Sequence, residues 1–308
     1  MAIKLSFVVP AYNEEHYIGG CVEAILQEIG SRNDCEVVVS DNNSNDRTDA
    51  IVSAIAARDP RVILVRETRR GANRTRQTGF ETSHGEIVAF IDADTKMPPG
   101  WVRRMEAEFS RNPKLVCISG PFVYYDLPKG VRILVRTFFI LGYIMYILGR
   151  LLFRTTTIVQ GGNYAVRRWA LDKIGGQDVN IIFYGDDTDL AVRLSRVGTV
   201  KFSFKLPILA SGRRLAKEGA WTMGVRYAIN NFWMVFFRRP YTTVSREIRF
   251  SQETVYQPDN KTRERVIAVL FTTVVLLIFC AIAFAIYVLA KDGVFSTVSL
   301  AQFIAGKR

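Results

Sequence analysis

The stretch "IVAFIDADT" (residues 87–95) carries two carboxylates, Asp92 and Asp94, directly after five apolar residues. The run 87–91 is short and apolar, and Pro-Pro breaks the chain soon after it, which predicts a buried strand. Two like charges so close together repel each other. A divalent cation between them would relieve this repulsion, because hard metals take oxygen ligands. Aspartate is also common in solvated turns, so from this stretch alone a metal site and a turn both remain open.

The chain around this stretch alternates short β-branched runs with helical patterns. Besides 87–91, strands are expected at 5–10, 36–40, 62–66 and 115–119. Helices are expected near 14–29, 48–58, 72–82 and 100–110. This βαβα order predicts an α/β fold, with a mainly parallel sheet that is covered by helices on both faces.

Polar residues collect where the expected strands end. The clusters are "PAYNEE", "SDNNSNDRT", "RETRRGANRTRQTG" and "DADT". Ligands of such sheets bind beyond the carboxyl ends of the strands, so the clusters predict one ligand site at this edge. Two common nucleotide sites are excluded, because no G-x-G-x-x-G follows the first strand and no G-x-x-x-x-G-K-[ST] occurs in the sequence.

The positive charge of the chain lies in its second half. The formal net charge is +12, yet residues 1–130 hold 16 Lys and Arg against 18 Asp and Glu. Residues 131–308 hold 25 against 11, and they also contain the long apolar stretches. Anionic lipid headgroups explain this coincidence better than nucleic acid does. We therefore expect a membrane surface, and no nucleic acid, as a partner.

Histidine and cysteine exclude other site types. Two histidines are too few for a histidine-rich metal centre. The four cysteines show no C-x-x-C spacing and are typical of buried thiols in a reducing compartment. The first residues, "MAIKLSFVVPAY", lack the apolar core of a signal peptide and predict the first strand.

Residues 266–290 predict a transmembrane helix. They form 25 consecutive residues without a charge, which as a helix would be about 37 Å long, enough for a hydrocarbon core of about 30 Å. A buried core helix is the alternative. Lys and Arg concentrate before the segment, so the positive-inside rule places residues 1–265 in the cytoplasm. We expect a single pass through the inner (cytoplasmic) membrane, followed by the short tail 291–308.

Residues 131–155 behave differently, because their uncharged centre is too short to cross a bilayer. On a helical wheel, all four arginines of this stretch fall on one narrow face, and the other faces are apolar. This pattern is typical of an amphipathic helix that lies in the membrane interface. A buried helix with one basic edge remains the alternative.

Six motifs in order resemble family 2 inverting glycosyltransferases, which have the nucleotide-diphospho-sugar transferase (glycosyltransferase A-type) fold. They are "VVPAYNEE", "VVVSDNNSNDRT", "GANRTRQTG", "FIDADT", "GGNYAVRR" and "YGDDTDLAVRL", within residues 5–215. The resemblance implies a membrane-anchored, bacterial-type member. The domains it suggests are a nucleotide-sugar-binding half (1–130), the interfacial helix (131–155), an acceptor-side and catalytic-base region with a basic aromatic helix (156–240), a basic linker (241–265), the transmembrane helix and the tail.

The resemblance also implies roles for individual residues. The donor nucleotide would contact Pro10, Ala11, Asn13, Glu15, Asp41, Arg76, Gln77, Asp92 and Ala93. Asp92 and Asp94 would bind Mg²⁺ or Mn²⁺ bridged to the donor diphosphate. Asp187 would be the general base, with Asp186 beside it, although capping of the following helix is the alternative role of these aspartates. Sugar or phosphate groups of the donor or acceptor would contact Gly162, Asn163, Arg213 and Arg214.

Three functions remain open at this point. The first is an inverting hexosyltransferase of cell-envelope glycan synthesis that moves a sugar from a nucleotide-diphospho-sugar to a hydroxyl of a lipid-linked acceptor, by metal-assisted direct displacement. The second is a polyprenyl-phosphate glycosyltransferase, whose phosphate acceptor needs no base. The third is a non-catalytic, nucleotide-sugar-binding membrane scaffold.

Overall fold

The computed structural model describes residues 2–133, 158–181 and 185–219, with a few single positions in 135–143 and 223–230. All of them belong to the first of two compact units, Met1–Thr254 and Val255–Arg308. The expected linker, transmembrane helix and tail (241–308) therefore lie outside the described residues, as does most of the interfacial helix. Among the described residues, no helix is both long and apolar enough to cross a bilayer.

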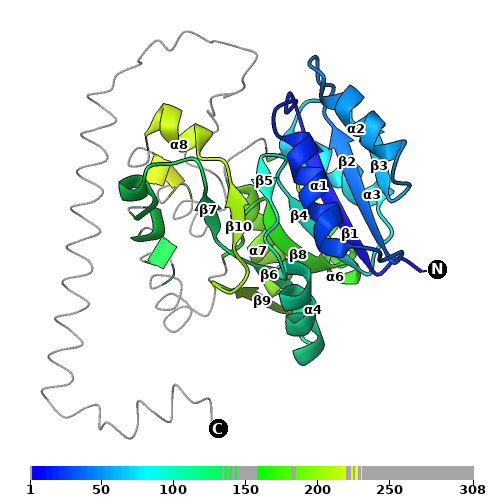
Figure 1. Ribbon diagram of the computed structural model, residues 1–308. Helices are drawn as coiled ribbons and strands as arrows, with labels where there is room; N and C mark the ends of the chain where they lie inside the picture. Colours follow the sequence, from blue (N-terminus) through cyan, green and yellow to red (C-terminus); the bar gives the residue numbers. More distant parts are fainter. Residues whose placement is uncertain are drawn as a thin grey trace, which may run out of the picture. The chain divides into compact units, whose positions relative to one another are not determined.

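A seven-stranded sheet forms the centre of the first unit (Figure 1). Its order is β3 (Val62–Arg66), β2 (Cys35–Asp41), β1 (Leu5–Ala11), β4 (Ile87–Ile91), β8 (Asn163–Arg167), β6 (Leu115–Ser119) and β9 (Thr199–Phe202). The five strands expected from the sequence are confirmed, and their bounds differ from the expected ones by at most one residue. Their residues are mostly buried, as apolar runs in a sheet covered on both faces should be.

Strand β8 makes the sheet mixed rather than purely parallel. It runs antiparallel to β4 and β6, whereas the other neighbouring pairs are parallel. Its register pairs Asn163 with Ile91, so the start of β8 lies beside the end of β4. Gly161 and Gly162 thus lead directly into a core strand. As a result, Gly162 is adjacent to Asp92, whose backbone N–H donates to the Gly162 carbonyl at 3.2 Å.

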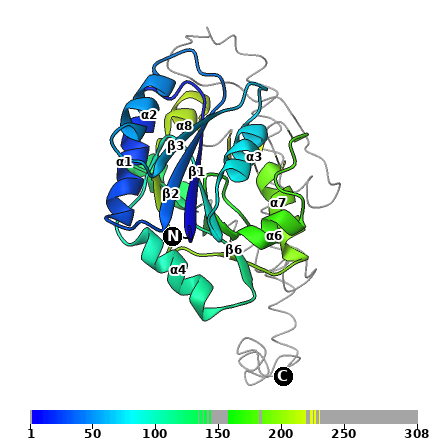
Figure 2. The same cartoon turned by 90° about the vertical axis from the view of Figure 1, so that its right-hand side faces the viewer.

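Helices cover both faces of this sheet (Figure 2). One core cluster includes residues of α1 (Ile18–Ile29), α2 (Thr48–Ala56) and α4 (Trp101–Arg111). The other includes residues of α3 (Ala72–Thr82), α6 (Arg168–Lys173) and α7 (Asp186–Ser195). The four expected helices are confirmed. However, α1 begins four residues later than expected, because the backbone N–H groups of Glu14 and Glu15 donate to the side chains of Thr48, the first residue of α2, and of Asp46 in the loop before it.

A smaller sheet connects the end of β4 to a distant part of the chain. It consists of β5 (Thr95–Lys96), β10 (Ile208–Ala210) and β7 (Phe122–Tyr124), in that order. β10 is antiparallel to β5 and parallel to β7, and α8 (Arg213–Glu218) follows it. This pairing carries the residues after β10 to Asp94, whose carbonyl accepts from Ser211 N–H at 3.0 Å.

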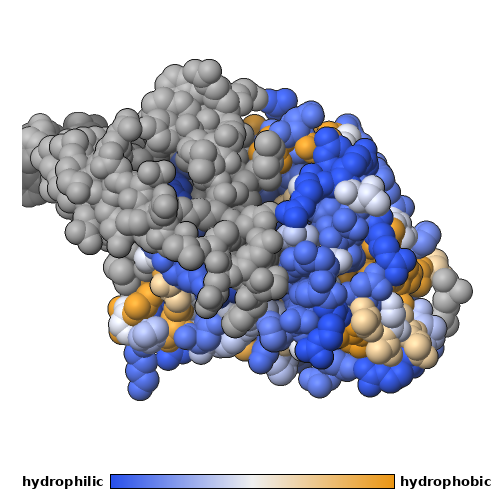
Figure 3. Space-filling model, turned by 90° about the horizontal axis from the view of Figure 1, so that it is seen from above, coloured by the Kyte–Doolittle hydropathy of each residue, from blue (hydrophilic) through white to orange (hydrophobic). Residues whose placement is uncertain are grey.

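The described surface seen from above is mainly hydrophilic (Figure 3). Hydrophobic residues form separate small patches in this view rather than one continuous face. Single exposed apolar side chains are normal on a globular protein, so these patches do not by themselves indicate a binding surface.

Helix α3 packs closely on β1 through Gly79, which leads to a stability prediction. A Cβ at this position would lie 2.5 Å from Cγ1 of Val8, a fully buried and stiff side chain. We expect Gly79→Ala to lower the free energy of unfolding by about 1–2 kcal/mol, because overpacking outweighs the gain in helix propensity. Chemical denaturation of the protein in detergent measures this change.

The matched control is Gly20→Ala in α1, where an added Cβ meets nothing within 4 Å. This substitution should raise stability by up to about 1 kcal/mol. Equal effects of the two substitutions would contradict the close packing of α3 on β1.

Candidate active site

Two arginines from distant parts of the chain hold the carboxylates that follow β4. Arg76 Nη2 of α3 lies 3.1 Å from Asp92 Oδ1, and Arg213 Nη2 of α8 lies 3.1 Å from Asp94 Oδ2. The Asp92 side chain is 32% exposed and that of Asp94 is 20% exposed, so both remain accessible to a ligand. Each of the two carboxylates after β4 is therefore paired with an arginine rather than placed in a fully solvated turn.

Arg76 also connects Asp92 to the acidic start of α7. Its Nη1 atom lies 3.1 Å from Asp186 Oδ2, and the arginine side chain is only 10% exposed. Burial alone would lower the pKa of Arg76, but the negative charges of Asp92 and Asp186 outweigh it and hold that pKa above its ordinary value. One buried cation thus brings the expected metal ligand and the expected base pair together.

Asp187 is held by the backbone rather than by a cation. Its Oδ2 atom accepts a hydrogen bond of 2.9 Å from Gly161 N–H. Burial raises the pKa of this carboxyl well above its usual range, and the charge of Asp186 adds to the rise, whereas Arg76 reduces it. Both aspartates lie in the first turn of α7, directly after its N-cap residue Gly185, where negative charge also suits the helix N-terminus. A carboxylate with a raised pKa can accept a proton near neutral pH.

Gly161 and Gly162 leave no room for side chains beside the two carboxylates. A Cβ on Gly161 would lie 2.4 Å from Asp187 Oδ1, and one on Gly162 would lie 2.0 Å from Asp92 Cγ. Gly162 also has φ of +79°, in the left-handed region that favours glycine. The glycine pair before β8 is therefore part of the wall of the site.

Arg213 is positioned by the loop after β1. Its Nη2 atom donates to Glu14 Oε1 at 2.6 Å, and its guanidinium lies 4.8 Å from the centre of the Tyr17 ring. Burial lowers the pKa of Arg213, but the hydrogen bond to Glu14 and the charge of Asp94 raise it above its ordinary value overall. Arg213 therefore stays charged beside Asp94.

The expected nucleotide-binding residues of the first two loops lie together. Asn13 N–H donates to Ser44 Oγ at 2.9 Å, and Asn13 Oδ1 accepts from Asn45 N–H at 2.9 Å. Asp41, at the end of β2, accepts from the N–H and hydroxyl of Ser44. Pro10 and Ala11 end the adjacent strand β1, and Ala93 is buried between Asp92 and Asp94. Glu15 turns to the rim of this loop pair, where it binds Arg47.

Two expected ligand contacts have packing roles instead. The Asn163 side chain is fully buried, accepts from Trp101 Nε1 at 3.1 Å and donates to the Leu206 carbonyl at 2.9 Å. Gln77 donates to Glu81 and accepts from Gln177 N–H at 2.9 Å. These amides are occupied by protein groups, so the expectation that Asn163 and Gln77 contact the donor or acceptor disagrees with their placement.

Other positioning residues were not expected from the sequence. Asn73 donates to the carbonyls of Asp178 and Ile181, which lead towards the base pair on α7. Glu14 holds Arg213, although its neighbour Glu15 was expected to contact the nucleotide. Both residues lie inside the quoted motifs, but only their spatial neighbours reveal their roles. Arg214 follows Arg213 at the start of α8.

The donor set at Asp92 and Asp94 fits a hard divalent cation. Among the described residues, no group of three or more His, Cys, Asp and Glu side chains is arranged to hold a metal. Mg²⁺ typically uses one or two carboxylates and completes its shell with water and substrate phosphates. A pair of partly exposed carboxylates with cationic counter-charges matches this kind of site.

The comparison with protein families decides the classification. The family model described as "Glycosyl transferase family 2" matches residues 6–175, more than half of the chain. The chain belongs to glycosyl transferase family 2. The match includes α3, the Asp92–Asp94 pair and the glycine pair of this family 2 member, whereas α7 and Arg213 lie beyond it.

Two curated relatives cover parts of this family 2 chain. Glycosyltransferase AglE of Haloferax volcanii is 35% identical over 127 residues, which is 41% of each protein. A Campylobacter jejuni GalNAc(5)-diNAcBac-PP-undecaprenol beta-1,3-glucosyltransferase is 30% identical over 99 residues, 32% of this chain and 31% of the relative. Each match thus spans less than half the length of the relative.

A solved structure shares the fold of this family 2 member. The mannosyltransferase PcManGT of Pyrobaculum calidifontis, solved in complex with GDP-Man and Mn²⁺, superposes with a TM-score of 0.59. It is 22% identical, and the match covers 75% of this chain and 64% of that chain. The expected nucleotide-sugar transferase-like fold is therefore confirmed.

The glycine pair gives a first test of the site. We expect Gly162→Ala to lower activity by at least about tenfold, because the new Cβ would displace the Asp92 carboxylate and strain the backbone. Nucleoside diphosphate release from the donor measures this loss. Gly130→Ala, where an added Cβ meets nothing within 4 Å, is the control and should keep full activity. A fully active Gly162→Ala variant would contradict the proposed wall.

A second test concerns Glu67, which orders the loop after β3. Its hydrogen bonds from Arg69 lower the pKa of Glu67 to about 2, assisted by Thr78. A lowered folded-state pKa contributes stability above the ordinary value of 4.5, and this contribution is lost as pH falls towards 2. Unfolding free energy should therefore fall more steeply in the wild type than in Glu67→Gln between about pH 4.5 and 2. Glu86→Gln, an exposed glutamate, should follow the wild type; identical slopes in all three proteins would refute this role of Glu67.

Proposed function

We propose that this protein is a metal-dependent, inverting hexosyltransferase that moves a sugar from a nucleotide-diphospho-sugar to a hydroxyl of a lipid-linked acceptor. The observation that carries the proposal is the pairing of the buried Arg76 with two aspartates. Asp92 is expected to lie near the donor diphosphate, and Asp186 lies beside the expected general base. A displacement reaction needs both ends at once: stabilisation of the leaving group and deprotonation of the nucleophile.

The donor would lie along the carboxyl edge of β1, β2 and β4. Asn13, Asp41 and the ends of the first two strands would contact the nucleotide, and Arg76, Arg213 and Arg214 would face its phosphates. Arginine suits this role, because its planar fork binds phosphate oxygens through two hydrogen bonds. The GDP-Man in the PcManGT complex supports a nucleotide-sugar donor, since the two chains share the fold.

Asp92 and Asp94 would hold the divalent cation, Mg²⁺ or Mn²⁺. When bound, the metal neutralises negative charge that develops on the departing diphosphate. The Mn²⁺ in the same neighbouring complex supports this assignment. Arg76 and Arg213 would hold the two carboxylates in orientation while the site is open.

Asp187 would accept the proton of the acceptor hydroxyl. As the hydroxyl oxygen forms its bond to the anomeric carbon, the bond from that carbon to the diphosphate oxygen breaks on the opposite face, which inverts the configuration. The O–H proton passes to Asp187, and the bonding electrons of the broken bond leave with the nucleoside diphosphate. The Gly161 N–H holds Asp187 in place, and Asp186 anchors the pair to Arg76.

A lipid-linked acceptor is supported by two further observations. The Campylobacter relative is named for an acceptor linked to undecaprenol through a diphosphate. The amphipathic pattern at 131–155 and the uncharged segment 266–290 suit a protein at the inner membrane with its catalytic unit in the cytoplasm. A polyprenyl-phosphate acceptor would make Asp187 unnecessary, because such an acceptor is already anionic.

The proposal predicts metal-dependent release of a nucleoside diphosphate. Purified protein in detergent would be given UDP-, GDP- and dTDP-sugars with a lipid extract, in the presence of Mn²⁺, Mg²⁺ or EDTA. We expect release from one donor, with losses of at least about a hundredfold in EDTA, in Asp92→Asn and in Asp187→Asn. Asp172→Asn, an exposed aspartate of α6, is the control and should keep full activity.

Three other outcomes of this experiment would each contradict a specific part of the proposal. Release that continues in EDTA would overturn the metal assignment. An active Asp187→Asn variant beside a dead Asp92→Asn variant would favour a phosphate acceptor. Donor binding without turnover for any acceptor in the extract would favour the non-catalytic scaffold.

A further inference from the structure

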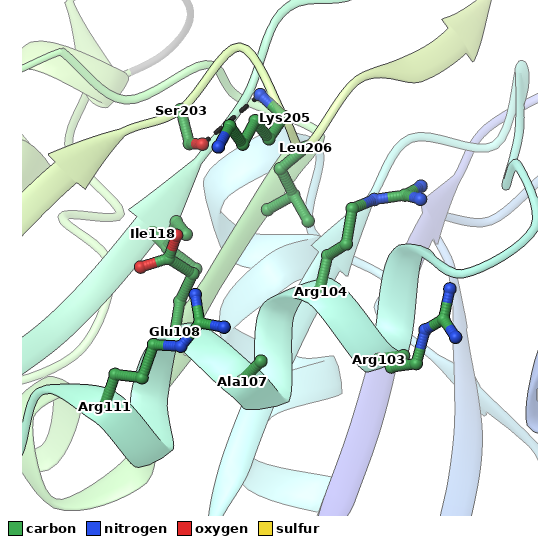
Figure 4. A pocket seen from close by; sticks show the side chains of 9 residues that line it. All are labelled: Arg103, Arg104, Ala107, Glu108, Arg111, Ile118, Ser203, Lys205 and Leu206. Atoms are coloured by element: carbon green, nitrogen blue, oxygen red, sulfur yellow. Dashed lines mark hydrogen bonds between the residues drawn. The ribbon is translucent and has the colours of Figure 1, made fainter.

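A separate cavity of about 280 Å³ lies between α4 and the turn that follows β9 (Figure 4). One wall is the outer face of α4, and the other is formed by Ser203, Lys205 and Leu206. None of the carboxylates or arginines of the candidate active site lines it. The cavity is therefore a second place on the molecule that can hold a ligand, and it does not depend on the proposed function.

Four cationic residues line this cavity, although most of its exposed lining surface is apolar. Arg104, Ala107 and Arg111 follow one another at intervals of three and four residues, which places them on the same face of α4. Arg103 joins them from α4, and Lys205 adds a positive charge from the opposite wall. Within the part of the chain that the structure describes, these four cations form no ion pair.

The acid in this lining is already neutralised. Glu108 lies 2.7 Å from Lys201 Nζ, a residue of β9 outside the cavity lining. Glu108 therefore does not offset the four cations, and the cavity keeps an excess of positive charge. An anion that enters it would meet attraction from both walls.

Hydrogen-bond donors accompany the charges. The Nε atom of Arg104 is buried and has no partner among the described residues, while Nη2 of the same side chain donates to the Pro99 carbonyl at 3.1 Å. The Ser203 oxygen accepts from Lys205 N–H at 3.3 Å, which leaves its hydroxyl hydrogen as a donor. Arginine and hydroxyl donors around one space are typical of phosphate recognition.

We propose that this cavity binds a phosphate group, as a site distinct from that of the donor diphosphate. Part of the lining is apolar, since Ala107, Ile118 and Leu206 belong to it. Its volume equals that of about nine water molecules, which leaves room for an apolar group attached to the phosphate. The same chemistry is offered by a small soluble phosphate and by the phosphate of a phospholipid headgroup.

The two walls are held apart by the protein itself, so the site is already formed. Trp101, the first residue of α4, donates to Asn163 Oδ1, and the Leu206 carbonyl accepts from Asn163 Nδ2. The fully buried side-chain amide of Asn163, at the start of β8, is thus hydrogen-bonded to both walls. A preformed cavity of this kind binds without the entropy loss of ordering its walls.

The test uses the full chain in a non-ionic detergent and a phosphate-free buffer. Inorganic phosphate is titrated into the wild type and into Arg111→Gln/Lys205→Gln, which removes one exposed cation from each wall. We expect the variant to bind phosphate at least about tenfold more weakly. Arg104→Gln, which removes the donor of the buried Nε, should weaken binding to a similar extent, and thermal unfolding confirms that each variant is folded.

Two controls separate this site from general electrostatics and from the candidate active site. Arg196→Gln/Lys173→Gln removes one Arg and one Lys from exposed positions elsewhere. Arg213→Gln removes an arginine expected to face the donor phosphates. Both should change the phosphate affinity assigned to the cavity by less than about twofold. Equal weakening in the control pair and in the cavity pair, or no measurable binding to the wild type, would overturn the proposal.

The source of the phosphate is distinguished by a second titrant, dihexanoyl phosphatidic acid. Binding at least about tenfold tighter than that of inorganic phosphate, and lost in Arg111→Gln/Lys205→Gln, identifies a phospholipid headgroup. Equal or weaker binding of the lipid, with phosphate binding still lost in that variant, identifies a small soluble phosphate. Either result supports the site; lipid binding that is unchanged in the variant, without phosphate binding, contradicts it.

Discussion

The candidate active site depends on one interaction, the pairing of the buried Arg76 guanidinium with two carboxylates. The guanidinium lies between Asp92 and Asp186, two carboxylates that belong to elements far apart in the sequence. Without this cation, neighbouring negative charges would face each other in a poorly solvated place, and removing one partner of such a network leaves a buried charge uncompensated. Arg76 can reach both acids because Gly79, one turn further along α3, lets the helix approach β1 closely.

Strand pairing also positions the carboxylates of the site. Strand β8 enters the sheet antiparallel to β4, so Gly162 meets Asp92 after β4, and Gly161 beside it meets Asp187 at the start of α7. The small sheet does the same for Asp94, because β10 pairs with β5 and delivers Arg213 from α8. Each carboxylate with an expected catalytic or metal-binding role is thus bound by a group that is distant in the sequence. Such supported positions are what an active site needs for its geometry.

The same packing explains where the sequence-based interpretation succeeded and where it did not. The cluster with Asp92 and Asp94 is expected at the edge where the strands of an α/β sheet end, and the family resemblance adds Asp186 and Asp187 to the same site. Asn163 and Gln77 come from equally plausible motifs, yet their amides are occupied by Trp101, Leu206, Gln177 and Glu81. An amide that packs and an amide that binds a ligand look the same in a sequence. Glu14 and Glu15 differ in role for a similar reason: only the position of Arg213 distinguishes them.

The sequence by itself determined five strands of the main sheet, the four helices between them, and the edge at which the polar clusters meet. Those features follow from apolar periodicity and chain order, which act over a few residues. Only the tertiary structure decided that β8 enters between β4 and β6, that two arginines hold the acid pair after β4, and that a basic cavity forms away from this site. The physical reason is that charge pairing and close packing depend on which segments become neighbours. Segments as far apart as Glu14 and Arg213 become neighbours only when the whole sheet is assembled.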